Sequence, residues 1–324
     1  MRAKKQKGRV AVITGIEDAH IPFVERHLSA PLILLDMREL ADGTELSYQL
    51  IGDQIVASYR GESLQDITGV WYRKPQPIPQ EELSVEPAFR SYSADAIERH
   101  GMLLRTAFEH ATWVSDYYAM ARANQKSYQL AIARRLGFRV PDTVITSSPD
   151  VARAFIKKYP RCVSKSLTPT YPKFKGKQQI LLTTLITVDS PLPDFSNLYL
   201  APSIFQEAVN ASYDVRVTVV GDNVFPAIMT SGVERSGTYR SIRDNRLGDM
   251  QLEVAANFPK DVAERCIAHV KELGLNFGAI DLIVDKKGVY WFLENNPNGQ
   301  WAFVEEITGL PIGKALAGLL EQGR

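Results

Sequence analysis

Two strand-like segments near the C-terminal end place the strictest limit on how this chain can fold. The first carries Asp281 within Gly278-Ala-Ile-Asp-Leu-Ile-Val-Asp, and the second ends in Glu294-Asn-Asn296 after a run of apolar residues. Because side chains alternate between the two faces of a strand, Glu294 and Asn296 point the same way. Asp281 can join them from a neighbouring strand. The pattern therefore predicts paired strands, over 278–284 and 289–295, with polar side chains gathered on one face.

These three side chains form a set of hard oxygen donors. Two carboxylates and an amide oxygen, completed by water and phosphate oxygens, suit Mg²⁺ bound together with a nucleotide. A neutral Asn ligand leaves part of the charge of two Mg²⁺ ions to stabilise a transferring phosphoryl group. The alternative is that Asp281 ends a strand and that 295–299 is a plain turn, which its residue types favour. The position of Glu294 argues against this, because the run before it is too apolar for a casually exposed strand end.

Composition excludes several other classes of protein. The chain has 324 residues, 45% hydrophobic and 23% charged, which is enough for two or three domain-sized units. The formal charge of +1 gives no global field for nucleic acid or an anionic membrane. Cys162 and Cys266 lie far apart, which implies neither a disulfide framework nor a zinc site. The basic segment 1–9 is not followed by a signal core, and no apolar run reaches the roughly 18 residues that span a bilayer. We expect a cytoplasmic protein.

Periodicity predicts the elements along the chain. The first third begins as a parallel βαβ unit, with a strand at 10–14, a helix at 22–28 and a strand at 31–35. Gly52-Asp53 is expected to close a hairpin. The further expected strands are 46–51, 54–59, 69–75, 140–146, 161–165, 180–187, 203–209, 214–220 and 224–230, and the expected helices are 86–110, 124–136, 148–158, 261–273 and 312–320. A polar loop is expected at 166–177, and a domain boundary near 113–116.

The order of the motifs resembles the ATP-grasp superfamily. It runs from Asn124-Gln-Lys126 through Lys165, Phe205-Gln-Glu-Ala-Val209 and Asp214-Val-Arg216 to the Asp281 and Glu294-x-Asn296 set. Within the superfamily the sequence is similar to the branch of the ribosomal-protein glutamyl ligase and, more closely, to the microviridin-type peptide macrocyclases, or graspetide synthetases. The best matches are Val70-Trp-Tyr-Arg-Lys-Pro75, Val140-Pro-x-Thr143 after Lys126, and the segment 292–301 followed by Glu306-x-Thr-Gly-Leu-Pro-Ile312.

The resemblance implies an α/β ATP-grasp fold in three parts. Residues 1–113 would form an N-terminal βαβ pre-ATP-grasp domain. Two α+β subdomains, 114–207 and 208–324, would clasp ATP between them, and the second would carry the metal site of Asp281, Glu294 and Asn296.

Residue by residue, the resemblance assigns roles around the nucleotide. Lys126 and Lys165 match the lysines that hold the phosphates, although a strand lysine beside a loop is more often an ordinary surface residue. The nucleotide-binding hinge would comprise Gln206, Glu207 and Val209, with the backbone of the last two at the adenine; a simple buried strand is compatible with this assignment.

Further residues match positions near the ribose and the reacting groups. Asp214 would lie near the ribose and Arg216 near the γ-phosphate and the bound carboxylate, because a guanidinium binds oxyanions bidentately. The alternative is a pair on a solvated strand. Thr238-Tyr-Arg240 stands where the macrocyclases show Asp-Trp-Arg, so Arg240 keeps the family's arginine and Arg243 could share its role. The loop 166–177 corresponds to the mobile phosphate cover, and the five histidines are interpreted as structural or surface residues.

The implied reaction is ATP-dependent carboxylate activation. An acyl phosphate would form on a side chain of a ribosomally made precursor peptide and be closed by an amine into an ω-amide, or by a hydroxyl into an ω-ester. In that family a leader peptide docks away from the chemistry, near the central helix and a hairpin, and the resemblance implies that the corresponding hairpin here is 214–230. Two alternatives stay open: a glutamyl or amino-acid ligase acting on a protein terminus or free amino acids, and a non-catalytic peptide-binding module. The oligomeric state is open, with a homodimer as one option.

Overall fold

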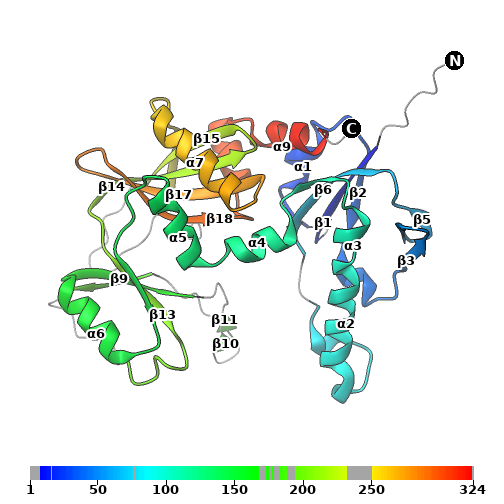
Figure 1. Ribbon diagram of the computed structural model, residues 1–324, viewed down its shortest axis with the longest axis horizontal. Helices are drawn as coiled ribbons and strands as arrows, with labels where there is room; N and C mark the ends of the chain where they lie inside the picture. Colours follow the sequence, from blue (N-terminus) through cyan, green and yellow to red (C-terminus); the bar gives the residue numbers. More distant parts are fainter. Residues whose placement is uncertain are drawn as a thin grey trace.

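The computed structural model describes residues 8–15, 17–75, 78–167, 173–174, 177–178, 183–187, 194–231 and 250–322. Figure 1 shows an N-terminal lobe on one side, a C-terminal lobe that lies against it, and a separate lobe built around β9, β13 and α6. Within the described residues, no helix has both the length and the apolar character needed to cross a membrane.

The N-terminal lobe is built on a parallel sheet of four strands in the order β2-β1-β6-β7. These strands are β1 (Arg9–Thr14), β2 (Leu32–Leu35), β6 (Ile67–Lys74) and β7 (Thr112–Val114). The predicted βαβ start is confirmed, because β1 and β2 pair in parallel around α1 (Ile21–Glu25). The hairpin of β3 (Leu46–Ile51) and β4 (Gln54–Tyr59) has its predicted bounds, and β5 (Glu62–Ser63) extends it.

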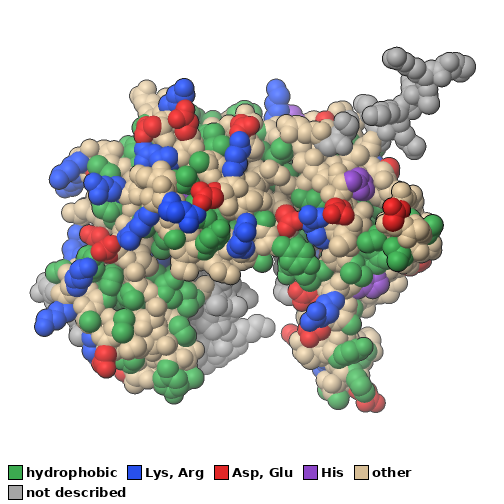
Figure 2. All heavy atoms as spheres, in the orientation of Figure 1, with side chains coloured by type: hydrophobic (Ala, Val, Ile, Leu, Met, Phe, Trp, Pro, Cys, Tyr) green, Lys and Arg blue, Asp and Glu red, His purple; other side chains and the backbone are tan. Residues whose placement is uncertain are grey.

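A long helix predicted over 86–110 is wrong in its extent and in its packing. The chain forms α2 (Arg90–Met102) and then α3 (Leu104–Ala107), and α2 buries no residue. Within the range 86–110, only Leu104 and Phe108 are buried. Figure 1 shows α2 projecting from the lobe, and Figure 2 shows hydrophobic side chains on this projection. Periodicity identified the helix but could not show that its packing leaves every residue of α2 at least partly exposed.

The separate lobe around β9, β13 and α6, called the central lobe because it is the middle part of the sequence, carries an antiparallel sheet in the order β12-β9-β13-β8. The helix α6 (Pro149–Lys158) packs against this sheet. Its strands are β8 (Thr143–Thr146), β9 (Arg161–Ser166), β12 (Thr184–Thr187) and β13 (Ser203–Glu207). The Ser148 hydroxyl caps α6 by accepting from the Val151 N–H. Within the expected loop 166–177, β10 (Lys173–Phe174) pairs with β11 (Lys177–Gln178), and the remainder from 168 lies outside the described residues.

The C-terminal lobe holds five antiparallel strands in the order β16-β15-β14-β17-β18. They are β14 (Ala211–Val220), β15 (Asn223–Ser231), β16 (Met250–Val254), β17 (Phe277–Asp285) and β18 (Tyr290–Asn296). The covering helices are α4 (Tyr117–Ala123), α5 (Lys126–Arg135), α7 (Lys260–Glu272), α8 (Ala302–Thr308) and α9 (Ile312–Leu320). The helix predicted over 124–136 is confirmed as α5, whereas α4, α8 and β16 were not predicted.

Two hydrophobic cores fix the C-terminal sheet. On one face Val215, Val217 and Leu282 pack with α5 and α7 in a cluster that includes Ile132 and Val270. On the other side, a second cluster joins residues of α9 to strands of both the N-terminal and C-terminal sheets. The two lobes therefore share one core, and β1, β6, β14 and β17 are held in a fixed relation.

Candidate functional site

The predicted trio of polar side chains meets where β17 and β18 pair. Asp281 and Glu294 are register partners, and Ala279 pairs with Asn296. The amide nitrogen of Asn296 donates to Asp281 Oδ2 at 3.2 Å and to Glu294 Oε1 at 3.3 Å. Two carboxylates and one amide thus lie within hydrogen-bonding distance of one another.

A β-bulge sets the direction of Glu294. The register shifts by one residue at this point, so that Asp281 pairs with Glu294 while Leu282 pairs with Phe292. In a regular strand Phe292 and Glu294 would share a face, but the extra residue Leu293 separates them. Phe292 is consequently buried in the core under α5 and α7, whereas Glu294 turns to the polar side.

Two cations flank the carboxylates. Lys126, the first residue of α5, places its ammonium 2.8 Å from Glu294 Oε2. Arg216 is the register partner of Asp281, and its Nε lies 2.7 Å from Asp281 Oδ1. Asp214 and Arg216 are both buried, so the alternative of a pair on a solvated strand is wrong.

Gln129 holds α5 against β18 and so positions Lys126. Its buried side-chain amide accepts from the Asn295 N–H at 3.0 Å and donates to the Asn295 carbonyl oxygen at 2.7 Å. A pair of buried hydrogen bonds to the backbone of one residue fixes both partners. Lys126 lies one helical turn before Gln129, which directs its side chain toward the end of β18.

A second polar group lies on the central sheet. The Lys165 ammonium donates to Gln206 Oε1 at 3.2 Å, and Gln206 Nε2 donates to the Thr143 hydroxyl at 3.0 Å. Glu207 ends β13, and its N–H donates to the Asp142 carbonyl oxygen. Val209 is buried in the connection to β14. The structure therefore divides the predicted residues between two sheets joined by this connection. Arg240 and Arg243 lie outside the described residues.

The trio fits a magnesium ion by its donor chemistry. Among the described residues, no group of three or more His, Cys, Asp or Glu side chains is placed to hold a metal ion, and the set here is two carboxylates with an amide. Hard oxygen donors of this kind leave coordination positions for water and phosphate oxygens, which is typical of Mg²⁺ held with a nucleotide. The Asn296 amide carries an acceptor oxygen as well as its donor nitrogen, so it can also contribute an oxygen.

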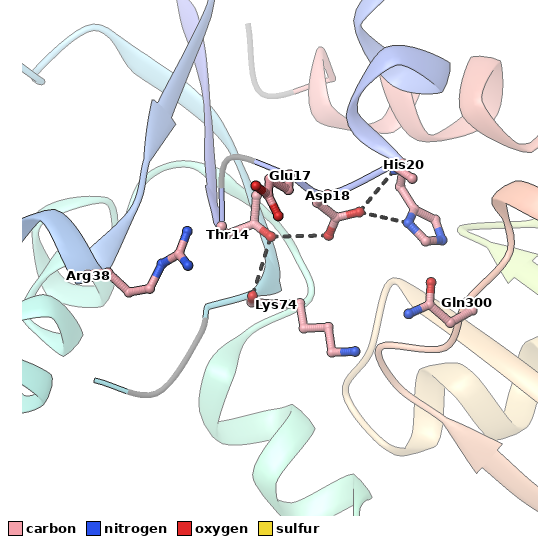
Figure 3. A pocket seen from close by; sticks show the side chains of 9 residues that line it. Thr14, Glu17, Asp18, His20, Arg38, Lys74 and Gln300 are labelled. Carbon is pink, nitrogen blue, oxygen red and sulfur yellow. Dashed lines mark hydrogen bonds and ion pairs between the residues drawn. The ribbon is translucent and has the colours of Figure 1, made fainter. Parts of the chain in front are cut away.

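A cavity of about 480 Å³ lies at the ends of β1 and β6, lined among others by Thr14, Asp18, Arg38, Lys74 and Gln300. Figure 3 shows Arg38 on one side of it and Gln300 on the other. Ligands of open α/β sheets bind outside the carboxyl ends of the strands. The Gln300 carbonyl oxygen accepts from Arg216 at 3.3 Å, which makes the cavity a direct neighbour of the trio.

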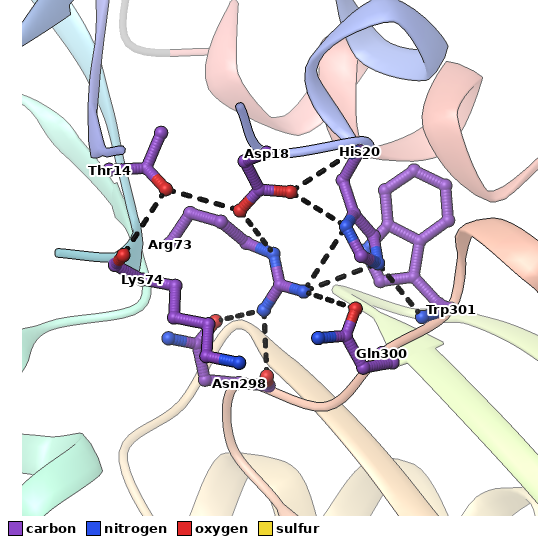
Figure 4. Close-up of polar contacts among 8 residues, drawn as sticks. All are labelled: Thr14, Asp18, His20, Arg73, Lys74, Asn298, Gln300 and Trp301. Carbon is purple, nitrogen blue, oxygen red and sulfur yellow. Dashed lines mark hydrogen bonds and ion pairs between the residues drawn. The ribbon is translucent and has the colours of Figure 1, made fainter. Parts of the chain in front are cut away.

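Arg73 connects this cavity to the loop that follows Asn296. Its guanidinium is buried and donates to the Asn298 carbonyl oxygen at 2.7 Å and to Gln300 Oε1 at 3.1 Å, as Figure 4 shows. Asp18 lies 3.4 Å from its Nε. The sequence analysis included Arg73 in the motif 70–75 but assigned it no role. The signal that could have identified it is a charged residue within the largely apolar strand β6.

The acidic partner of Arg73 stays ionised. Burial alone would raise the pKa of Asp18, but hydrogen bonds from His20 and the charge of Arg73 outweigh burial and hold it well below its usual range. His20 Nδ1 lies 2.7 Å from Asp18 Oδ1, and the Trp301 N–H donates to His20 Nε2 at 3.2 Å. Burial lowers the pKa of His20, so this imidazole is the neutral link between Asp18 and the loop.

Solved structures share the arrangement of these lobes. A RiPP-associated ATP-grasp ligase of Chryseobacterium gregarium, in complex with ADP and a leader and core peptide, aligns with a TM-score of 0.87 at 24% identity over 97% of this chain and 96% of its own. Macrocyclase MdnC of Microcystis aeruginosa MRC, bound with precursor peptide MdnA, gives 0.81 at 23% identity over 96% and 99%. ATP-grasp ligase PsnB, with minimal precursor, Mg and ADP, gives 0.76 at 20% identity over 98% of each chain. The predicted ATP-grasp fold is confirmed.

No curated protein sequence matches the chain. A family model described as a RimK-like ATP-grasp domain matches residues 121–320, which is more than half of the chain and includes both polar groups described above. The chain belongs to the RimK-like ATP-grasp family.

Proposed function

We propose that this protein is an ATP-dependent ligase that activates a side-chain carboxylate of a ribosomally made precursor peptide and closes it into a macrocycle. The observation that carries the proposal is the meeting of Asp281, Glu294 and Asn296 with Lys126 and Arg216. The solved ligases that align over nearly the whole chain are described with precursor peptides, ADP or Mg, which supports the same substrate class here.

The proposed roles follow the two polar groups. Lys126 and Lys165 neutralise the phosphates, and Gln206, Glu207 and Val209 hold the adenine. Asp214 lies by the ribose, while Arg216 and Arg240 stabilise the reacting phosphoryl group. Asp281, Glu294 and Asn296 would hold two Mg²⁺ ions. These ions would supply positive charge beside the transferring phosphoryl group.

The chemistry requires no protein nucleophile. A carboxylate oxygen of the peptide attacks the γ-phosphorus of ATP, the bond to the β,γ-bridging oxygen breaks, and ADP leaves. An amine or hydroxyl of the peptide then attacks the acyl carbon of the acyl phosphate, loses its proton and releases phosphate. Each link therefore removes the elements of one water molecule from the peptide, and electrostatic stabilisation by the cations accounts for the catalysis. We place this reaction in the cytoplasm, where ATP is supplied.

The test is incubation of the full chain with Mg²⁺, ATP and a precursor peptide encoded beside it, followed by intact-mass analysis. The expected result is loss of one water mass per link, with one ADP formed for each. Coupling of a free amino acid, without mass loss inside a peptide, would favour an amino-acid ligase. ATP turnover identical in the wild type and in Asn296→Ala would favour a non-catalytic binding module.

A further inference from the structure

The two basic side chains that line the cavity beside Gln300 differ in what they already bind. The Arg38 guanidinium donates to Asp36, with 2.7 Å between Nη2 and Oδ2. Lys74 is exposed, and within the part of the chain that the structure describes its ammonium has no hydrogen bond or ion pair. Of the two, Lys74 is therefore the cation that can take a new partner.

The charges of the cavity are arranged unevenly. Hydrogen bonds to Asp36 raise the pKa of Arg38, and the charges of Asp36, Glu17 and Asp42 add to this, so acidic groups gather on the Arg38 side. Asp18 is engaged by Arg73, His20 and the Thr14 hydroxyl. Figure 3 shows Lys74 extending toward the Gln300 side, away from Arg38. A carboxylate entering the cavity is thus attracted to the end nearest Gln300.

That end is also the one next to the candidate phosphoryl-transfer site. Gln300 lines the cavity, and its carbonyl oxygen accepts from Arg216, whose Nε lies 2.7 Å from Asp281 Oδ1. Arg73, paired with Asp18, donates to the Gln300 side chain. Gln300 thus contacts both the cavity and Arg216, so a carboxylate held at the Gln300 end would lie on the side of the candidate phosphoryl-transfer site.

We propose that this cavity receives the acidic residue of the peptide and that Lys74 pairs with its carboxylate, which makes Lys74 a specificity-determining residue. This inference rests on the proposed function and names the substrate group that the site selects. A compact ammonium attracts a carboxylate but offers little to the isosteric amide, so the enzyme selects Asp or Glu over Asn or Gln. The carboxylate remains ionised, as an attacking oxygen must.

The probes for the test are N-acetyl-glutamate α-amide and its neutral analogue N-acetyl-glutamine α-amide. Each is titrated by NMR into the full-length protein loaded with Mg²⁺ and ADP. We expect the acidic probe to bind at least about tenfold more tightly than the neutral one. The preference is expected to disappear in Lys74→Met and to persist in Lys74→Arg. Lys287→Met, an exposed lysine on the β17–β18 turn, is the matched control and retains it.

The inference is overturned if Lys74→Met binds the acidic probe as the wild type does, or if the wild type holds both probes equally or neither. Thermal melting of each variant shows whether the fold is retained. ADP binding is measured in the same samples: failure of the wild type to bind ADP contradicts the proposed function itself, whereas normal ADP binding without a probe preference contradicts only the role of Lys74.

Discussion

Lys126 and Glu294 stand 168 positions apart in sequence, yet the Lys126 ammonium lies 2.8 Å from Glu294 Oε2. One residue was predicted to bind phosphate and the other to bind metal. Their contact brings the two predicted roles together in a single polar group at the start of α5 and the end of β18. Both side chains are about one-quarter exposed, so the pair adds little to stability. Substitutions here should affect nucleotide binding much more than folding.

Replacement of Lys126 by Met should weaken ATP binding. The variant loses the ammonium that would neutralise phosphate charge, and we expect the KM for ATP to rise about tenfold or more while the melting temperature changes little. Steady-state ADP release measures the first and thermal melting the second. Lys157→Met, on the exposed side of α6, is the control. An unaltered KM for ATP in Lys126→Met would remove this lysine from the site.

Replacement of Asn296 by Ala should abolish most ATP turnover. The variant keeps both carboxylates but loses the neutral donor between them, and we expect the rate to fall about 100-fold or more, in the range seen when one oriented polar group is removed. Asn197→Ala, in an exposed turn, should behave as the wild type. Equal ADP formation by the two variants would contradict the assignment of Asn296.

Much of the fold followed from local patterns, because its strands and helices carry their own signals. The hairpin at 46–59 and the helix at 312–320 have their predicted bounds, since a Gly-Asp turn and a continuous apolar face define them. The strand β7 and the helix α4 are short, and their burial comes from neighbours distant in sequence. No short segment of the sequence around β7 or α4 indicates which distant residues will bury it.

Arg73 should contribute strongly to stability. In Arg73→Met the buried Asp18 loses its cation, and the loop at Asn298 and Gln300 loses its donor. Breaking a buried pair in this way costs about 3 kcal/mol or more in free energy of unfolding. The double variant Asp18→Asn/Arg73→Met should recover part of the loss, because no unpaired charge is left. Chemical denaturation measures both; equal stability of Arg73→Met and wild type would exclude this role.

The protein should lose stability as the pH falls from about 6.5 toward 4. Burial lowers the pKa of His269 to about 4 from its ordinary 6.5, so in this window the unfolded chain binds the proton and the native protein does not. The neutral native state is therefore favoured above 6.5 and progressively disfavoured below it, by roughly 3 kcal/mol in all. His269→Gln should flatten the dependence of unfolding free energy on pH. An identical pH profile in wild type and variant would contradict this.

Two glycines of α9 should respond in opposite ways to alanine. A Cβ on Gly313 would lie 2.1 Å from the Phe23 carbonyl oxygen, so Gly313→Ala forces the helix away from the N-terminal lobe and destabilises the protein. Gly318 is exposed and has nothing within 4 Å of the same position. Gly318→Ala should stabilise the protein by about 0.5–1 kcal/mol through helix propensity. Thermal melting compares them, and equal effects would show that α9 does not approach Phe23 this closely.

The candidate site was predictable in its residue types but not in its connections. Alternation indicated that Glu294 and Asn296 share a face, yet the bulge that separates Phe292 from Glu294 depends on pairing with β17. Lys74 and Gln300 belong to motifs that the sequence identified, but their meeting at one cavity depends on the shared core of two lobes. Such relations arise from tertiary packing, which sequence spacing does not encode.

The most direct measurement is calorimetric titration of a non-hydrolysable ATP analogue into the full-length protein, with Mg²⁺ and with EDTA. The account predicts saturable binding by the wild type that depends on Mg²⁺. It further predicts at least tenfold weaker binding by Asp281→Asn/Glu294→Gln, which removes both carboxylate charges from the trio. A wild type that does not bind the analogue, or a double variant that binds it as tightly as the wild type with the same response to Mg²⁺, would contradict the central claim.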